Sequence, residues 1–345
     1  MKQLPVNKVK APEIYGDFWF NSDPITIHAM HGQVILLCFW DYTSDSSLQL
    51  LGLVKEWHKR YAEMGLVVIG IHSPEFSFGR NVKLVETAVQ QYEIHFPVAT
   101  DNTSMMRDAY RVRDLPSMFL IERDGGIYSS HSGEGGYEST ERAIQALLRE
   151  AGFHGELPLL IEFSGTNEEV QQTFQRSTPP LRTGYLHGSL GNVEGYSPAL
   201  PAEYTDAQIY FEGKFYAQGD WLAQSDAFEY RGEPNKGYLA LSYAGSNASI
   251  VMAAEKPGAV VKVTLDDRSV APQDRGADLS ADNAGNTFLE VNEPRLFHLV
   301  RNKKFGDHTL KIIPMEKGTT VYMFSFSAQP LTLLNIVGKN SYRNN

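Results

Sequence analysis

The chain has 345 residues, of which 42% are hydrophobic and 21% charged, as in ordinary soluble globular proteins, and this length favours two domains. Its net charge of −10 argues against a nucleic-acid partner, because phosphate binding needs clustered lysine and arginine. No apolar run approaches the roughly 20 residues of a membrane span, and residues 1–8 lack the apolar core of a signal peptide. We therefore expect a cytoplasmic protein that contacts no membrane.

The chain contains one cysteine, Cys38, within an apolar run that predicts a buried strand. An intrachain disulfide is impossible with one thiol, and so is a redox cycle between two cysteines of the chain. A structural zinc site built on several thiolates is excluded for the same reason. No metal or other cofactor is expected.

Strands and helices alternate in the pattern of residues 34–152. Apolar runs predict strands, apolar residues spaced three and four apart predict helices, and Arg123–Gly126 is typical of a hairpin turn. In chain order, the expected elements are a strand at 34–38, a helix at 50–61, a strand at 66–71, helices at 82–92 and 104–110, strands at 115–121 and 127–131, and a helix that ends before Gly152. This order predicts an α/β sandwich around a mixed sheet.

Two segments carry a resemblance to a known family. They read Gly32-Gln33-Val34-Ile35-Leu36-Leu37-Cys38-Phe39-Trp40-Asp41-Tyr42-Thr43-Ser44-Asp45-Ser46-Ser47 and Gly65-Leu66-Val67-Val68-Ile69-Gly70-Ile71-His72-Ser73-Pro74-Glu75-Phe76. The TlpA/DipZ-like branch of thioredoxin-like proteins typically has Gly-Lys-Val-Val-Leu-Val-Asp-Phe-Trp-Thr-Tyr-Ser-Cys-Ile-Asn-Cys and Gly-Leu-Val-Val-Ile-Gly-Val-His-Thr-Pro-Glu-Phe at these places. The chain resembles this branch over about residues 10–152, which implies a thioredoxin fold.

The departures from the family pattern bear on activity. Ser44 and Ser47 stand where the family has the two cysteines of Cys-x-x-Cys, and Cys38 stands where thioredoxins have a buried aspartate that helps to move a proton. Pro116 occupies the place of the cis-proline that faces the active-site turn. The resemblance therefore implies a preserved groove beside a degenerate redox site at Ser44 and Ser47.

The second half of the chain is predicted to be all-β. Residues 156–204 are expected to be a linker with a short helix at 166–176, and 205–345 a β-sandwich or jelly roll. The expected strands are 209–211, 238–243, 249–252, 260–265, 287–291, 295–300, 308–313 and 320–326, with a turn at Gly219-Asp220-Trp221. This region resembles the C-terminal part of DipZ-type proteins, which is likened to carbohydrate-binding modules. The first domain is placed at 1–155.

The turn at Ser44-Asp45-Ser46-Ser47 has three interpretations. Serine and aspartate are favoured at helix N-termini, so the turn is explained by capping alone. It could also bind an anion or a peptide carbonyl through its amides and hydroxyls. Nucleophilic catalysis by Ser44 would need a base within hydrogen-bond reach; His72 and Asp41 are available in principle, but no nucleophile-elbow motif supports this.

The remaining candidate binding residues are chosen by position. They are Trp40 beside the turn, Glu75 after a strand end, Pro116, and Trp221, which with neighbouring tyrosines could form a sugar-stacking platform although such aromatics also fill β-sandwich cores. Two weak patterns do not support a metal site. They are the pair His28 and His31 and the aspartates Asp266, Asp267, Asp274, Asp278 and Asp282.

The leading hypothesis is a redox-inactive thioredoxin-like protein that binds or scaffolds a carbohydrate or protein ligand. One alternative is an enzyme with repurposed non-redox chemistry in an interdomain or jelly-roll pocket. Another is peroxidase-like activity at Cys38, although its expected burial would make this thiol unreactive. The family resemblance suggests a location outside the cytoplasm, whereas the absence of a signal peptide suggests the cytoplasm.

Overall fold

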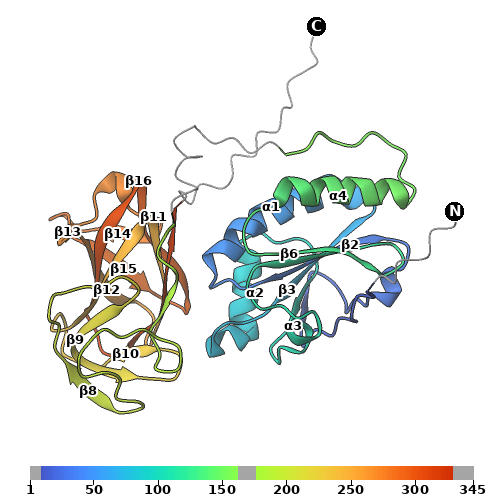
Figure 1. The fold of residues 1–345 in the computed structure, drawn as a ribbon. Helices are drawn as coiled ribbons and strands as arrows, with labels where there is room; N and C mark the ends of the chain where they lie inside the picture. The colour runs from blue at the N-terminus through green and yellow to red at the C-terminus, as the bar shows by residue number, and fades with distance from the viewer. Residues whose placement is uncertain (1–8, 162–175, 329–345) are drawn as a thin grey trace, which may run out of the picture. The chain divides into compact units, whose positions relative to one another are not determined.

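The computed structural model describes residues 9–161 and 176–328, which form two compact units (Figure 1). The N-terminal unit contains the first range and the C-terminal unit the second. The helix predicted at 166–176 falls outside the described residues, except for Arg176, which is not helical. None of the helices in the described ranges has the length and hydropathy needed to cross a membrane.

The N-terminal unit is built on a six-stranded mixed sheet in the order β1-β4-β3-β2-β5-β6. β2, β3 and β4 are parallel, and β1, β5 and β6 run antiparallel to their neighbours. The strands are β1 (Trp19–Phe20), β2 (Val34–Trp40), β3 (Leu66–His72), β4 (Val98–Thr100), β5 (Ser117–Ile121) and β6 (Ile127–Ser132). The helices are α1 (Asp45–Tyr61), α2 (Val82–Gln91), α3 (Met105–Ala109) and α4 (Tyr137–Glu150). The predicted thioredoxin-like fold of this part is confirmed.

β2 is buried along its whole length because side chains cover both faces of the sheet. Its even-numbered residues pack with α1, α2 and α4, and its odd-numbered residues pack with Met106 of α3 and with the neighbouring strands. The apolar stripe predicted for α1 is the buried one, formed by Leu50, Val54, Trp57 and Tyr61. This two-sided burial explains the continuous apolar run in the sequence.

A buried polar network fixes the end of the N-terminal unit. The Glu141 carboxylate of α4 accepts hydrogen bonds from the Tyr61 hydroxyl at 2.7 Å and the Ile161 amide at 2.8 Å. Gln145 donates to the Pro158 carbonyl at 2.8 Å, and Arg60 to the Leu159 carbonyl at 3.0 Å. Residues 158–161 therefore pack with this unit, beyond the predicted boundary at 155.

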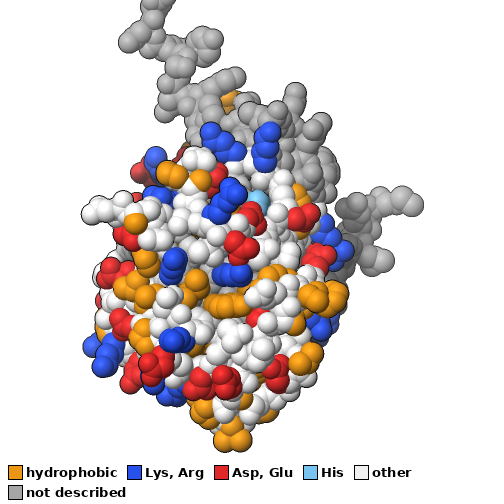
Figure 2. Space-filling view, turned by 90° about the vertical axis from the view of Figure 1, so that its left-hand side faces the viewer, with side chains coloured by type: hydrophobic (Ala, Val, Ile, Leu, Met, Phe, Trp, Pro, Cys, Tyr) orange, Lys and Arg blue, Asp and Glu red, His pale blue; other side chains and the backbone are white. Residues whose placement is uncertain are grey.

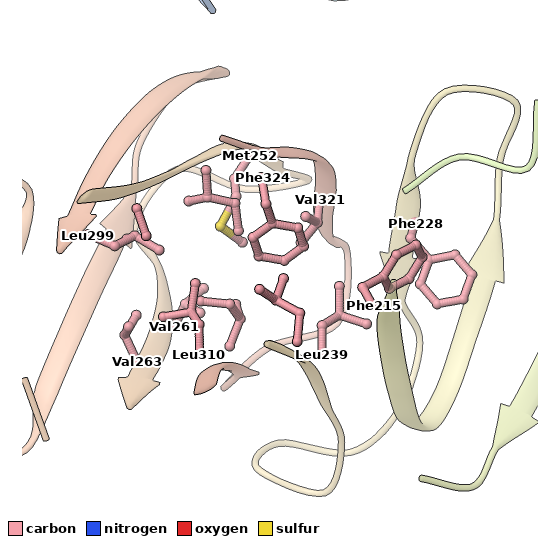
Figure 3. Packing of buried hydrophobic residues seen from close by; sticks show 14 of the residues in the cluster. Phe215, Phe228, Leu239, Met252, Val261, Val263, Leu299, Leu310, Val321 and Phe324 are labelled. Carbon is pink, nitrogen blue, oxygen red and sulfur yellow. The ribbon is translucent and has the colours of Figure 1, made fainter. Parts of the chain in front are cut away.

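The C-terminal unit is a large antiparallel sheet region with a dense apolar core, part of which Figure 3 shows between the strands. β9 pairs with both β10 and β11, so the sheet folds back on itself. The strands are β7 (Leu181–Arg182), β8 (Pro201–Tyr204), β9 (Phe215–Ala223), β10 (Phe228–Tyr230), β11 (Tyr238–Ala254), β12 (Ala259–Leu265), β13 (Arg268–Ser269), β14 (Leu279–Ala281), β15 (Thr287–Val291), β16 (Arg295–Pro314) and β17 (Thr319–Ser327). The all-β prediction is confirmed, and the jelly roll stays a prediction.

Several sequence-based boundaries in this unit were wrong. β7 and β8 pair with β17 and β9, so part of the predicted linker 156–204 belongs to the sheet. Residues 209–211 form no strand because their alternate apolar side chains are exposed in a loop. The expected strands at 238–243 and 249–252 are both parts of β11, those at 295–300 and 308–313 are both parts of β16, and the turn predicted at 219–221 lies within β9.

A register shift explains why β11 reads as two strands. Its pairing with β16 is irregular between Gly245 and Asn247. Before this point Leu239, Leu241 and Tyr243 face the core, and after it Ala248, Ile250 and Met252 do. A bulge of this kind moves the buried set from odd to even positions without ending the strand.

Candidate functional site

The turn between β2 and α1 is a helix cap, as predicted. Ser44 has extended backbone angles, with φ −104° and ψ 116°, and its Oγ accepts a hydrogen bond from the Ser47 amide at 3.3 Å. Asp45 lies in the first turn of α1, where its negative charge interacts favourably with the helix dipole and stabilises the helix. The two serines at the degenerate redox positions therefore stand at the N-cap and three residues later.

This turn is more enclosed than a binding loop on the surface. Ser44 is 7% exposed and Ser47 is 1% exposed. The Ser46 hydroxyl donates to the Leu115 carbonyl at 3.4 Å, next to the buried Pro116, whose peptide bond is cis. The structure thus brings Ser44, Asp45, Ser47 and Pro116 into one region.

Carboxylates make this region unfavourable for an anion. Desolvation, and after it the charge of Asp45, raises the pKa of the Glu134 carboxyl, although the residue as a whole is exposed. Asp45 itself lies in the first turn of α1. These two acids near the start of α1 disfavour the anion-binding interpretation.

Asp41 and His72 form a fully buried pair at the ends of β2 and β3. The parallel register places Trp40 opposite His72, and His72 Nε2 lies 3.5 Å from Asp41 Oδ1. Asp41 also accepts from the Thr43 amide at 2.9 Å and the Glu75 amide at 2.6 Å. Burial acts to raise the Asp41 pKa, but His72 and these amides outweigh it and lower the pKa below its ordinary value.

The pair sits among aromatic rings and buried polar atoms. The Tyr42 ring stacks on the His72 ring at 5.2 Å, and the Trp40 ring meets it edge-on at 5.4 Å. Within the described residues, Trp40 Nε1, Thr43 Oγ1, Ser47 Oγ and His72 Nδ1 are buried without a hydrogen-bond partner, and His72 Nε2 has only the 3.5 Å approach to Asp41, which is an ion-pair contact rather than a well-formed hydrogen bond. Trp40 is thus part of the packing around His72 and is not exposed to a ligand.

The arrangement does not support Ser44 as a nucleophile. Its Oγ contacts the Ser47 amide and lies 3.2 Å from Ser46 Oγ. In the described part of the chain, Ser44 Oγ makes no hydrogen bond with a histidine or a carboxylate, so no base is in reach. Asp41 instead holds backbone amides and His72.

Cys38 is buried in the middle of β2, and this burial raises the pKa of its thiol to about 12. The thiolate fraction at pH 8 is then about one in ten thousand. We expect native protein to release no colour from Ellman's reagent at pH 8, and unfolded protein to react with its one thiol. Rapid reaction of the native chain would contradict this burial.

Two other candidate residues, Glu75 and Trp221, do not place their side chains at the Ser44–Ser47 turn. Glu75 is half-buried, and its backbone amide is the group that meets Asp41. Trp221 is fully buried, stacks on Phe228 with ring centroids 5.4 Å apart, and donates to the Gln218 carbonyl. A sugar-stacking role for Trp221 was therefore a wrong expectation.

No group of three or more metal-binding side chains exists among residues 9–161 and 176–328. Most of the acidic residues considered for calcium make other contacts. Asp278 pairs with Arg295 at 2.6 Å, Asp266 with His308 at 2.8 Å and Asp267 with Lys311 at 2.5 Å. These carboxylates hold strands and loops together.

Both units match known families. Residues 32–127 match the family model described as thioredoxin-like, and residues 184–327 match the model described as thioredoxin like C-terminal domain. The first match includes the whole Ser44–Ser47 turn, and the second includes β8 to β17. The two matches occur in the order of the two units along the chain.

The matching relatives cover either most of the chain or about a third of it. Protein DipZ of Mycobacterium bovis is 25% identical over 335 residues, which cover 92% of this chain and 42% of DipZ. Thiol-disulfide oxidoreductase ResA of Bacillus cereus is 28% identical over 123 residues, covering 36% of this chain and 68% of ResA. The crystal structure of a thiol:disulfide interchange protein of the thioredoxin family from Chlorobium tepidum TLS is 15% identical, covers 42% of this chain and 99% of that chain, and has a TM-score of 0.37. The chain thus spans less than half the length of DipZ.

Proposed function

We propose that the chain, which contains a thioredoxin-like region and resembles DipZ, is a redox-inactive protein of the TlpA/DipZ-like group that binds or scaffolds a ligand. The observation that carries the proposal is that the chain has one buried thiol and no cysteine at the two active-site positions. The only thiol, Cys38, is buried with a raised pKa, and the two active-site positions are Ser44 and Ser47. Thiol–disulfide exchange requires an accessible thiolate, which this arrangement does not provide.

Insulin reduction by dithiothreitol tests the loss of thiol chemistry. We expect the full chain to accelerate insulin precipitation no more than buffer does, with a thioredoxin as positive control. Turnover by the wild-type chain that Cys38→Ser abolishes would overturn the proposal. Turnover that survives Cys38→Ser cannot come from a thiol of this chain and identifies a contaminant.

The ligand is assigned to the C-terminal unit because the turn of the N-terminal unit is enclosed. A protein or a carbohydrate ligand on a jelly-roll-like unit accords with the family resemblance. Trp221 is buried in the core of this unit, so it is not available to stack on a sugar. Isothermal titration of the full chain with defined peptides and oligosaccharides tests binding. If every peptide and oligosaccharide released only its heat of dilution, a binding role for these ligand classes would be contradicted.

Peroxidase-like activity at Cys38 is not supported by its surroundings. A peroxidatic thiol has to be a thiolate that peroxide can reach, and Cys38 satisfies neither condition. Sulfenic acid trapping with dimedone after peroxide treatment is expected to leave the native chain unlabelled. Stoichiometric labelling at Cys38 would restore this alternative.

A further inference from the structure

One face of the C-terminal sheet carries a row of half-buried side chains that crosses five strands. The register places Phe288 of β15 opposite Lys262 of β12, and Lys262 opposite Ile313 of β16. Tyr238 of β11 lies opposite Gln218 of β9. The antiparallel pairing of β11 with β16 puts Tyr238 beside Ile313. We call these five side chains the sheet row.

The sheet row lies on the solvent side of the sheet. All five side chains are half-buried, so part of each remains exposed. Their neighbours along the strands point to the other face and belong to the apolar core. Those neighbours are Leu239, Val261, Val263, Leu289 and Ile312. Figure 2 views the side of the unit where Figure 1 places β12 and β9, and it shows a band of hydrophobic side chains with lysine and arginine beside it. The row is therefore accessible to a ligand along its length.

One carboxylate holds two tyrosines in place at one end of the sheet row. The Tyr238 and Tyr210 hydroxyls donate to the same Asp206 oxygen, at 2.8 Å and 2.7 Å. The Tyr210 ring lies 5.3 Å from the ring of the buried Tyr216, which supports it on the sheet. Lys311 Nζ lies 5.7 Å from the Tyr238 ring. Rings fixed in this way lose little conformational entropy when a ligand packs on them.

The charges next to the sheet row are of both signs. Lys311 pairs with Asp267 at 2.5 Å. Glu290 of β15 lies two residues along from the residue opposite Lys262. The Asp206 carboxylate is already bonded to the two tyrosine hydroxyls. Such a surface attracts neither a polyanion nor a polycation, and it suits an uncharged polar ligand.

The place of the sheet row in the middle of a sheet disfavours a peptide ligand. β12, β16 and β11 each have a paired strand on both sides at the row. A peptide strand that adds to a sheet needs a free edge, and a helix needs a groove. An oligosaccharide needs neither, because the C–H face of a sugar ring packs on aromatic and aliphatic side chains while its hydroxyls bond to polar groups. From Phe288 to Tyr238 the row crosses three strand spacings, or about 14 Å, which a chain of several sugars covers.

We propose that the sheet row binds a linear, uncharged oligosaccharide that lies across the strands. This inference rests on the proposed binding function and assigns to it a ligand class and a surface. Phe288, Ile313 and Tyr238 supply the packing. Lys262 donates hydrogen bonds to sugar hydroxyls, and so does the NH₂ group of Gln218, whose carbonyl oxygen already accepts from the Asp206 amide at 3.0 Å.

Isothermal titration of the full chain with cellohexaose, xylohexaose, mannohexaose and maltohexaose tests this proposal. We expect at least one of these sugars to bind saturably, and Phe288→Ser with Tyr238→Ser to weaken that binding about tenfold or more. The matched control, Phe288→Tyr with Tyr238→Phe, keeps both rings and should retain the binding. Leu200→Ser removes an exposed apolar side chain beside the C-terminal end of β9, where the Ala199 amide donates to the Ala223 carbonyl, and should leave binding unchanged.

Circular dichroism shows whether each variant is folded, and the single variant Phe288→Ser, which leaves the Asp206 contacts intact, takes the place of a double variant that does not fold. Binding of none of the four sugars would overturn the inference, while heats from peptides would still support a binding role. Equal binding by the folded variant without the rings would overturn it as well, because the sugar would then lie elsewhere. So would a decaproline peptide that binds the wild-type chain but not this variant, because it assigns the row to a protein partner. Insulin turnover that depends on Cys38 would overturn the redox-inactive proposal but not this one.

Discussion

Replacing Ser44 and Ser47 by cysteine is expected to create a disulfide that dithiothreitol reduces. The two serines stand at the N-cap and the third helical residue of α1, with Ser44 Oγ 3.3 Å from the Ser47 amide. Side chains three apart at a helix start lie about 5–6 Å apart at Cβ, within a small backbone adjustment of disulfide geometry. The helix N-terminus stabilises a thiolate, while the Asp45 charge opposes it.

Mass spectrometry with and without reductant measures this outcome, and insulin reduction shows whether the new pair is active. Disulfide formation is expected to be complete in air, and insulin reduction should rise from the background of the wild-type chain. The single variant Ser44→Cys is the matched control, because Cys38 is too deeply buried to be its partner. A double variant that folds but forms no bond would show that the turn differs from that of the redox-active relatives.

Replacing Asp41 by alanine is expected to destabilise the N-terminal unit by about 3–5 kcal/mol, the usual cost of breaking a buried charged pair. The change leaves the buried amides of Thr43 and Glu75 without their acceptor and His72 without its partner. Urea unfolding monitored by circular dichroism measures the loss. The control Asp23→Ala, at an exposed position, should change the free energy of unfolding by less than about 0.5 kcal/mol.

The pH dependence of this effect follows from the direction of the pKa shift. The Asp41 pKa is lower in the folded chain than its ordinary value of about 3.9. Its charge therefore contributes stability above that pH, and the contribution disappears as the pH falls through the folded pKa. The difference in unfolding free energy between wild type and Asp41→Asn should be constant near neutrality and shrink below about pH 4. A difference that grows on acidification would contradict the assignment.

Local patterns predicted the N-terminal unit well because its elements are determined by nearby residues. The two-sided burial of β2 appears as a continuous apolar run, and the cap of α1 appears as Ser44 and Asp45. The Asp41–His72 pair was not predicted as a structural unit, since only the parallel register of β2 and β3 brings the residues together. The sequence did contain one indication that Asp41 has a special role, because Asp41 stands where the family pattern has threonine.

The C-terminal unit was harder to predict because alternation alone does not show which face is buried. Ile209 and Phe211 alternate as in a half-buried strand, yet both side chains are exposed in a loop. Trp221 could have stood on the surface or in the core, and only the stacking on Phe228 decides for the core. The bulge at Gly245 likewise divides one long strand into two apparent ones.

The length of β11 and β16 has a consequence for how the chain is made. These strands pair along most of their lengths, and they join residues far apart in sequence. Such contacts form slowly, because distant parts of the chain must meet before any stabilising contact is gained. The N-terminal unit leaves the ribosome first and has helices that form locally, so it is expected to fold ahead. During the delay, the unpaired edges of β11 and β16 are the part of the newly made protein most exposed to aggregation.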